Sequence, residues 1–389
     1  MKLIYSLWFM WAMSIGILII PSLVAFPAYI NLVGLALIIM LHNTFDYKFK
    51  SYNSFVIPVV IYIILSSVAS MKEGPINFSK QFLTLGFLAL SYASASEKQQ
   101  INLLKTYLYF CFFMSICGSM ASILVNTELV NLNEFKLSLT DISSGRFNWD
   151  IDIENGFNAP YGLGLVLTKG SSLYYFLGVP FYRSSGWSYE PTFASFFVVP
   201  SLILLIRENL ISKKMRLIMG AVILFFLFCC FSVASFAALL SLFVIFKILD
   251  PAKKGSKKIF WIFVIGFIGL FVVNLYNTYK IEQPGIDLIE SKLTEDSLSG
   301  INIFNISGKS ISDLSDLAIL ILYITFITSY AISAIRNSGL KQSMGLILLY
   351  FILHSVKGNW YHTMTLNITF IFFLYLTSNK IYNFESSKK

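Results

Sequence analysis

Long apolar runs, each bounded by a few polar residues, dominate the sequence from end to end. A membrane-spanning helix needs roughly 20 mainly apolar residues. That template predicts about twelve helices, over residues 3–22, 26–42, 53–70, 79–95, 101–125, 191–207, 215–231, 233–249, 258–278, 314–335, 340–356 and 361–378. The predicted fold class is an all-α polytopic integral membrane protein in which residues 1–389 form a single transmembrane domain.

Composition and charge support this class. The chain is 56% hydrophobic and only 13% charged, which excludes an ordinary soluble domain. Most of the 29 Lys and Arg residues lie in short connections that share one side of the membrane. The positive-inside rule then places both termini in the cytoplasm, with the first apolar run retained as a helix. The net charge of +9 is therefore a topology signal, and we expect no nucleic-acid binding.

Two connections on the opposite, outer side are enlarged and span about 126–190 and 279–313. Long loops between packed helices are commonly functional or disordered, and the aromatic residues of the first argue against disorder. Its Gly-rich part, 159–182, is too short to cross a membrane. We expect an interfacial or re-entrant helix there.

The segment 181–194, FYRSSGWSYEPTFA, combines charge and aromatic residues at the start of an apolar run. Arg183 can hold a phosphate through two parallel hydrogen bonds, or it can extend toward lipid headgroups. Glu190 can orient Arg183 or accept a proton, or it can serve only as the acid that precedes a helix beginning at Pro191. Beside them, Gly186 leaves the backbone open, and three aromatic faces suit sugar rings: Tyr182, Trp187 and Tyr189.

Two histidines flank the outer turn before the last predicted helix, in HSVKGNWYH. His354 and His362 can act as a proton acceptor or a sugar contact, or they can simply pack on aromatic rings at the interface. The same turn contributes Lys357 and Trp360, and the long loops add further cations for a diphosphate, Arg146, Lys280 and Lys309. The sequence contains no metal-binding or nucleotide-binding motif, so we expect neither a metal nor another cofactor.

The block RSSGWSYEPTFASF and the outer His362 before the final helix resemble the Wzy-type O-antigen polymerases, within the superfamily that includes the O-antigen ligases. The resemblance covers the whole chain at the level of topology. In one respect the chain departs from the family: its second long loop contains lysines but no arginine, and lysine is a poorer bidentate partner.

The resemblance implies an inner-membrane glycosyltransferase of lipopolysaccharide biosynthesis that works at the periplasmic face. It would move a growing glycan from undecaprenyl pyrophosphate onto a new lipid-linked repeat unit, without a metal. Arg183 would stabilise the leaving pyrophosphate, and His362, or else Glu190, would act as the base. Expected partners are membrane lipid, the lipid-linked oligosaccharide and a chain-length-regulating co-polymerase of the Wzz type.

Two other functions remain open. A lipid-linked oligosaccharide flippase also has about twelve helices, but it needs a polar path through the bilayer, and the ionisable residues here gather at the outer surface instead. An O-antigen ligase shares the fold and the donor and differs in its acceptor, which is lipid A core.

Overall fold

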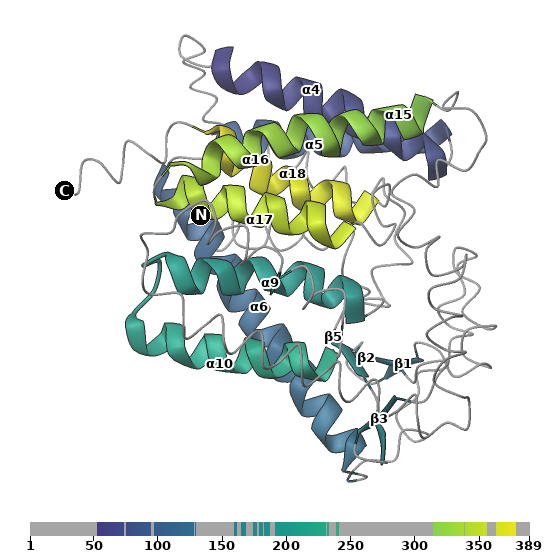
Figure 1. Cartoon of the computed structure of the whole chain (residues 1–389), viewed down its shortest axis with the longest axis vertical. Helices are drawn as coiled ribbons and strands as arrows, with labels where there is room; N and C mark the ends of the chain where they lie inside the picture. The colour runs from purple at the N-terminus through teal and green to yellow at the C-terminus, as the bar shows by residue number, and fades with distance from the viewer. Residues whose placement is uncertain are drawn as a thin grey trace.

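Roughly antiparallel helices form the body of the protein, and a small group of strands covers one end of them, in a computed structural model of the chain (Figure 1). The structure describes residues 53–73, 75–94, 97–127, 129, 159–161, 165–168, 174–176, 179–181, 183–186, 191–230, 232, 239–240, 314–337, 339–355 and 363–378.

Eight of the predicted helices fall within these residues, and all eight are confirmed as helical. They are α4 (Asn53–Ala69), α5 (Pro75–Ser94), α6 (Glu97–Asn126), α9 (Pro191–Arg207), α10 (Lys213–Cys230), the continuous helix formed by α15 (Leu314–Leu320), η6 (Ile321–Ile327) and α16 (Thr328–Ile335), α17 (Leu340–Ser355) and α18 (Thr363–Thr377). A short 3-10 turn, η2 (Ser70–Glu73), joins α4 to α5. The predicted helices 3–22, 26–42 and 258–278, and nearly all of 233–249, lie outside the described residues.

Two helices of the described chain are long and apolar enough to cross a membrane, Glu97–Asn126 and Leu317–Ile335. The second contains a π-helical stretch, η6, in which the Thr328 hydroxyl donates a hydrogen bond to the Tyr323 carbonyl five residues earlier. The Thr328 backbone amide also donates to the Tyr323 carbonyl, which is the five-residue spacing of a π-helix. This helix therefore stays continuous although its hydrogen-bond pattern changes midway.

Five short strands interrupt the helical pattern: β1 (Ala159–Tyr161), β2 (Leu165–Thr168), β3 (Tyr174–Phe176), β4 (Val179–Phe181) and β5 (Arg183–Gly186). An antiparallel sheet has the order β1-β2-β5, and β3 pairs with β4 in a separate hairpin. Across the first sheet, Thr168 lies opposite Arg183 and Leu167 lies opposite Ser184.

The expected interfacial or re-entrant helix in 159–182 is therefore wrong, and the all-α class becomes a mainly helical fold with a small β component. The physical reason can be read in the same segment. Val, Thr, Tyr and Phe favour strands, while the glycines between them, such as Gly164 and Gly178, disfavour a helix and suit turns.

Aromatic side chains fill the core between the helices, where the largest fully buried residues are all Tyr or Phe. Buried tyrosine hydroxyls also join helices that are far apart in sequence. Tyr62 of α4 donates to the Leu366 carbonyl of α18 at 2.9 Å, and Tyr375 of α18 donates to the Gln100 carbonyl of α6 at 2.8 Å. These bonds satisfy the phenol groups inside an apolar core and fix the register of α18 against its neighbours.

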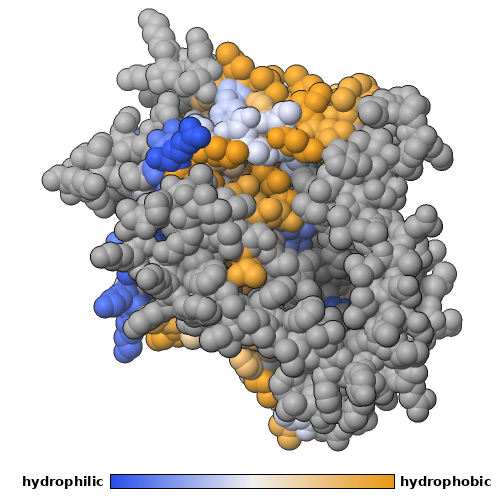
Figure 2. Space-filling model, in the orientation of Figure 1, coloured by the Kyte–Doolittle hydropathy of each residue, from blue (hydrophilic) through white to orange (hydrophobic). Residues whose placement is uncertain are grey.

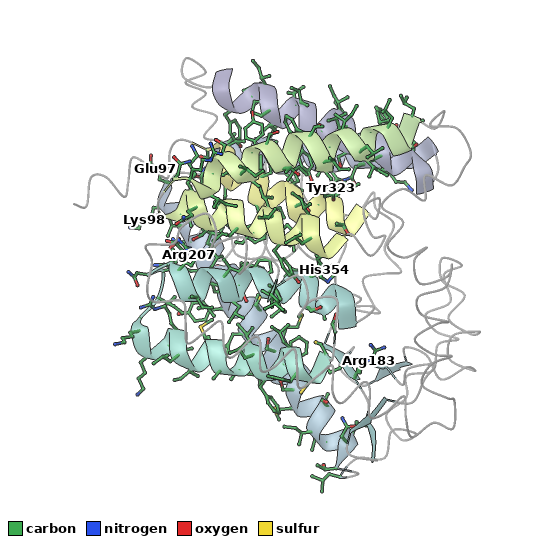
Figure 3. The ribbon with its side chains drawn as sticks, viewed as in Figure 1. Glu97, Lys98, Arg183, Arg207, Tyr323 and His354 are labelled. Carbon is green, nitrogen blue, oxygen red and sulfur yellow. The ribbon has the colours of Figure 1, made fainter. Side chains whose placement is uncertain are left out.

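The two ends of the helices differ in chemistry. At one end, which we call the basic end, lie Lys98 and Arg207 (Figure 3). The segments joined there by hydrogen bonds bring further cations to this end: Lys213, Lys214, Arg216, Arg336 and Lys341. Figure 2 shows hydrophilic residues at this edge and apolar residues over the helices beside it. The opposite end, which we call the sheet end, carries the strands, the start of α9 and the last residue of α10 (Figure 1). The described helices that meet at the basic end therefore alternate in direction.

Candidate functional site

Arg183 is the first residue of β5, and β5 packs at the sheet end against α6, α9 and α10. Figure 3 shows the guanidinium beside the strands, far along the bundle from Arg207. The side chain is half-buried, and the strand below it is anchored because Ser184 and Gly186 are both buried. Arg183 is therefore held at the sheet end by a strand that packs against three helices.

The backbone of β5 is shaped by two of its own residues. The Gly186 amide donates to the Ser184 hydroxyl at 3.2 Å, which closes a local turn. Gly186 itself has φ of 57°, a left-handed conformation that costs a side-chain-bearing residue energy. A Cβ at this position would lie 3.2 Å from Met114 of α6 and 3.2 Å from Phe226 of α10. Gly186 thus allows close packing, and its expected contact with a sugar stays a prediction.

The charge of Arg183 lies within electrostatic range of the Cys230 thiol, at the last residue of α10. The final carbonyl groups of an α-helix have no intrahelical partner and carry the negative end of the helix dipole. A cation is stabilised there. Measuring folding separately from activity therefore distinguishes a contribution of Arg183 to the end of α10 from a contribution to anion binding.

His354 lies in the last turn of α17 with only 2% of its surface exposed. Its ring is 5.0 Å from the ring of Phe196 and 5.6 Å from that of Tyr350. This is the aromatic packing that the sequence offered as the alternative to a functional role. The expected sugar contact at His354 would require the side chain to become more exposed.

The other predicted site residues lie outside the described part of the chain. They are Tyr182, Trp187, Tyr189 and Glu190 around Arg183, the loop cations Arg146, Lys280 and Lys309, and Lys357, Trp360 and His362 of the last outer turn. The structure nevertheless begins α9 at Pro191, as the Glu-Pro pair predicts. It also begins α18 at Thr363, so position 362 directly precedes that helix.

The sequence did not predict a polar cluster at the basic end. Arg207 donates to the Gln342 side chain, and Ser343 donates to the carboxylate of Glu208, which is 92% buried. Arg216 donates to the Glu208 carbonyl at 3.3 Å. These bonds tie the α9–α10 connection to the start of α17. The one local clue was an acidic residue inside an otherwise basic connection.

A second missed cluster joins α4, α5 and α18 through uncharged groups. The buried Gln81 amide donates to Asn367 at 2.9 Å and to Ser66 at 3.1 Å. The Thr365 hydroxyl, two residues before Asn367 in α18, is buried without a hydrogen-bond partner. Such bonds between helices in an apolar environment contribute about 0.6–2 kcal/mol each. This cluster fixes the first turns of α18, the helix that follows His362 in sequence.

Within the described part of the chain, the sheet end thus carries one half-buried arginine, on a strand packed against three helices. Among the described residues, no three His, Cys, Asp or Glu side chains group together as metal ligands do. A guanidinium offers phosphate two parallel donors without a metal. No protein-family model, curated protein or solved structure matches the chain.

Proposed function

We propose that the chain is a polytopic membrane glycosyltransferase that polymerises undecaprenyl-pyrophosphate-linked repeat units at the extracytoplasmic face. The observation that carries the proposal is the half-buried Arg183 on β5, a strand packed against three helices at the end opposite the basic end. A phosphate group bound there would meet a pre-positioned bidentate donor in a partly desolvated site.

The asymmetry of the bundle supports the orientation. The positive-inside rule assigns the basic end to the cytoplasm, which leaves the sheet end on the outer side. The two long apolar helices, Glu97–Asn126 and Leu317–Ile335, are consistent with passage through a bilayer. A lipid pyrophosphate has its isoprenoid chain in the membrane and its phosphates at the surface, so its charged part would reach the level of Arg183.

The proposed reaction needs one leaving group and one base. A hydroxyl of the acceptor sugar attacks the anomeric carbon of the donor glycan, and a new glycosidic bond forms as the bond to the pyrophosphate oxygen breaks. The pyrophosphate departs with the bonding electrons, and Arg183 stabilises its charge, helped by Arg146, Lys280, Lys309 or Lys357. The acceptor proton passes to His362, or else to Glu190. The donor is already activated, so no metal or soluble nucleotide is needed.

A flippase is the alternative from another class. The buried polar cluster of Gln81, Asn367 and Ser66 is the observation that bears on it. A transport path must be polar and open across the bilayer. These three side chains are uncharged, and each is at least 95% buried. They satisfy one another across helices instead of lining an open passage, so the polymerase remains the better-supported function.

Deleting the gene and separating the lipopolysaccharide on a gel tests the proposal. Loss of a polymerase leaves core with a single repeat unit, whereas loss of a ligase or of a flippase leaves core alone. Lipid-linked units that stay in the cytoplasm would then identify the flippase. Core carrying a full polysaccharide ladder in the deletion strain would contradict all three functions.

A further inference from the structure

Gly118 of α6 lies directly under the ring of Phe226 from α10. A Cβ at position 118 would be 2.3 Å from Phe226 Cε2 and 2.9 Å from Cδ2, well inside the 3.5–4.0 Å at which carbon atoms pack. It would also be 3.1 Å from the Ser184 hydroxyl of β5. Only glycine therefore allows α6, α10 and β5 to approach this closely.

The Phe226 ring also lies close to a second glycine. Phe226 is fully buried, and its tip meets the second glycine of the junction, since a Cβ at Gly186 would lie 3.2 Å from Phe226 Cζ. The ring is thus held between a glycine of α6 and a glycine of β5. A side chain added at position 118 would push the ring toward β5, the strand that begins with Arg183.

We propose that Gly118 is a positioning residue that sets, through Phe226, how deeply β5 and the Arg183 guanidinium lie against the bundle. This inference rests on the proposed function of Arg183 and deepens it. Gly118 contacts no substrate; it acts by fixing the strand that presents the cation to the pyrophosphate. Displacement of a transition-state donor by about an ångström lowers the rate by as much as about a hundredfold.

The chain offers two matched controls for a Gly118→Ala variant. A Cβ at Gly220 of α10, or at Gly86 of α5, would meet no atom within 4 Å. All three glycines lie inside helices, so each alanine brings the same gain in helix propensity. The three full-length variants differ mainly in whether the added methyl group meets Phe226.

Two measurements on membranes test the inference. The first is the rate of polymerisation of a lipid-linked repeat unit per folded molecule, where Gly118→Ala should lower kcat about tenfold to a hundredfold. Gly220→Ala and Gly86→Ala should keep the wild-type rate. The second is the rate of phenylglyoxal modification of Arg183, read by mass spectrometry, which should rise in Gly118→Ala alone. Adding Phe226→Leu to Gly118→Ala makes room for the methyl group and should restore both values.

The two measurements separate this inference from the proposed function. If Arg183→Ala is inactive but Gly118→Ala behaves like Gly220→Ala in both, the positioning role is wrong and the proposed function stands. If Arg183→Ala keeps full activity, the proposed function fails, and the phenylglyoxal rate alone decides whether Gly118 positions the strand. If Gly118→Ala lowers the rate and adding Phe226→Leu does not bring it back to the wild-type value, Gly118 does not act through the Phe226 ring.

Discussion

The arginines at the two ends of the bundle lie on different kinds of element. At the basic end, Arg207 and Arg216 donate to Gln342 and to the Glu208 carbonyl, and these bonds hold neighbouring helices together. At the sheet end, Arg183 is half-buried on β5, a strand that ends at Gly186 and lies close to Gly118 of α6. The number of cations at one end of the bundle therefore says little about the function of that end. What matters is the element that carries the guanidinium and the packing around it.

Of the substitutions at the two ends, Arg183→Ala should lower the polymerisation rate most. Removing the donor to a leaving pyrophosphate costs about a hundredfold to a thousandfold in rate, as for other donors that stabilise transition-state charge. We expect long-chain polysaccharide to disappear while single repeat units still reach the surface, as seen on a lipopolysaccharide gel. Arg183→Lys should retain partial activity, because lysine keeps the charge and loses the bidentate geometry.

Arg336→Ala is the matched control, because Arg336 is exposed at the basic end and follows α16 directly. It should leave the polysaccharide ladder unchanged. Normal chain lengths in Arg183→Ala, or equal losses in both variants, would remove Arg183 from the mechanism.

His362→Ala tests the proposed proton acceptor on the outer side. Loss of a general base typically lowers the rate about a hundredfold or more. His42 ends the predicted helix 26–42 on the opposite, cytoplasmic side in the predicted topology. His42→Ala should therefore have little effect on the polysaccharide ladder. Equal effects of the two substitutions would argue against a base at the outer face.

Glu208→Ala should destabilise the helix packing at the basic end without changing the polymerisation reaction. It removes the buried carboxylate to which Ser343 donates, which costs about 1–3 kcal/mol in unfolding free energy. We expect a lower melting temperature and lower abundance, with normal polymerisation per folded molecule. A variant with wild-type stability and no activity would show that the basic end takes part in the reaction.

The neutral cluster should show the smallest effect. A double-mutant cycle with Gln81→Leu and Asn367→Leu should give a coupling energy of about 0.6–2 kcal/mol, the range for hydrogen bonds between helices in membranes. Coupling is measured from unfolding in detergent. Additive effects of the two substitutions would mean that the amide bond does not stabilise the packing of α5 on α18.

The helices could be predicted from the sequence because their signal is local. Apolar length and flanking polar residues place α9 and the helix from Leu314 to Ile335 to the residue. The strands were missed because segments of three or four residues carry little periodicity, and the glycines around them suggested an irregular or re-entrant segment. Element type is therefore most predictable where a run is long.

The site was only partly predictable, for a different reason. Arg183 stands out in the sequence because a charge adjoins an apolar run. The contact of Gly118 with Phe226 and the bond between Glu208 and Ser343 join residues more than 100 positions apart, so no local pattern reports them. His354 is a case in which the sequence left two roles open. Its residue type suggested chemistry, while its surroundings turned out to be aromatic packing.

The most direct test of the account is the affinity of the purified full-length protein, in lipid nanodiscs, for undecaprenyl pyrophosphate. Arg183→Ala should raise the Kd at least about tenfold, equivalent to about 1.4 kcal/mol, while Arg336→Ala leaves it within about twofold of wild type. An unchanged Kd in a folded Arg183→Ala protein, or an equal loss in the Arg336→Ala control, would contradict a diphosphate site at the sheet end.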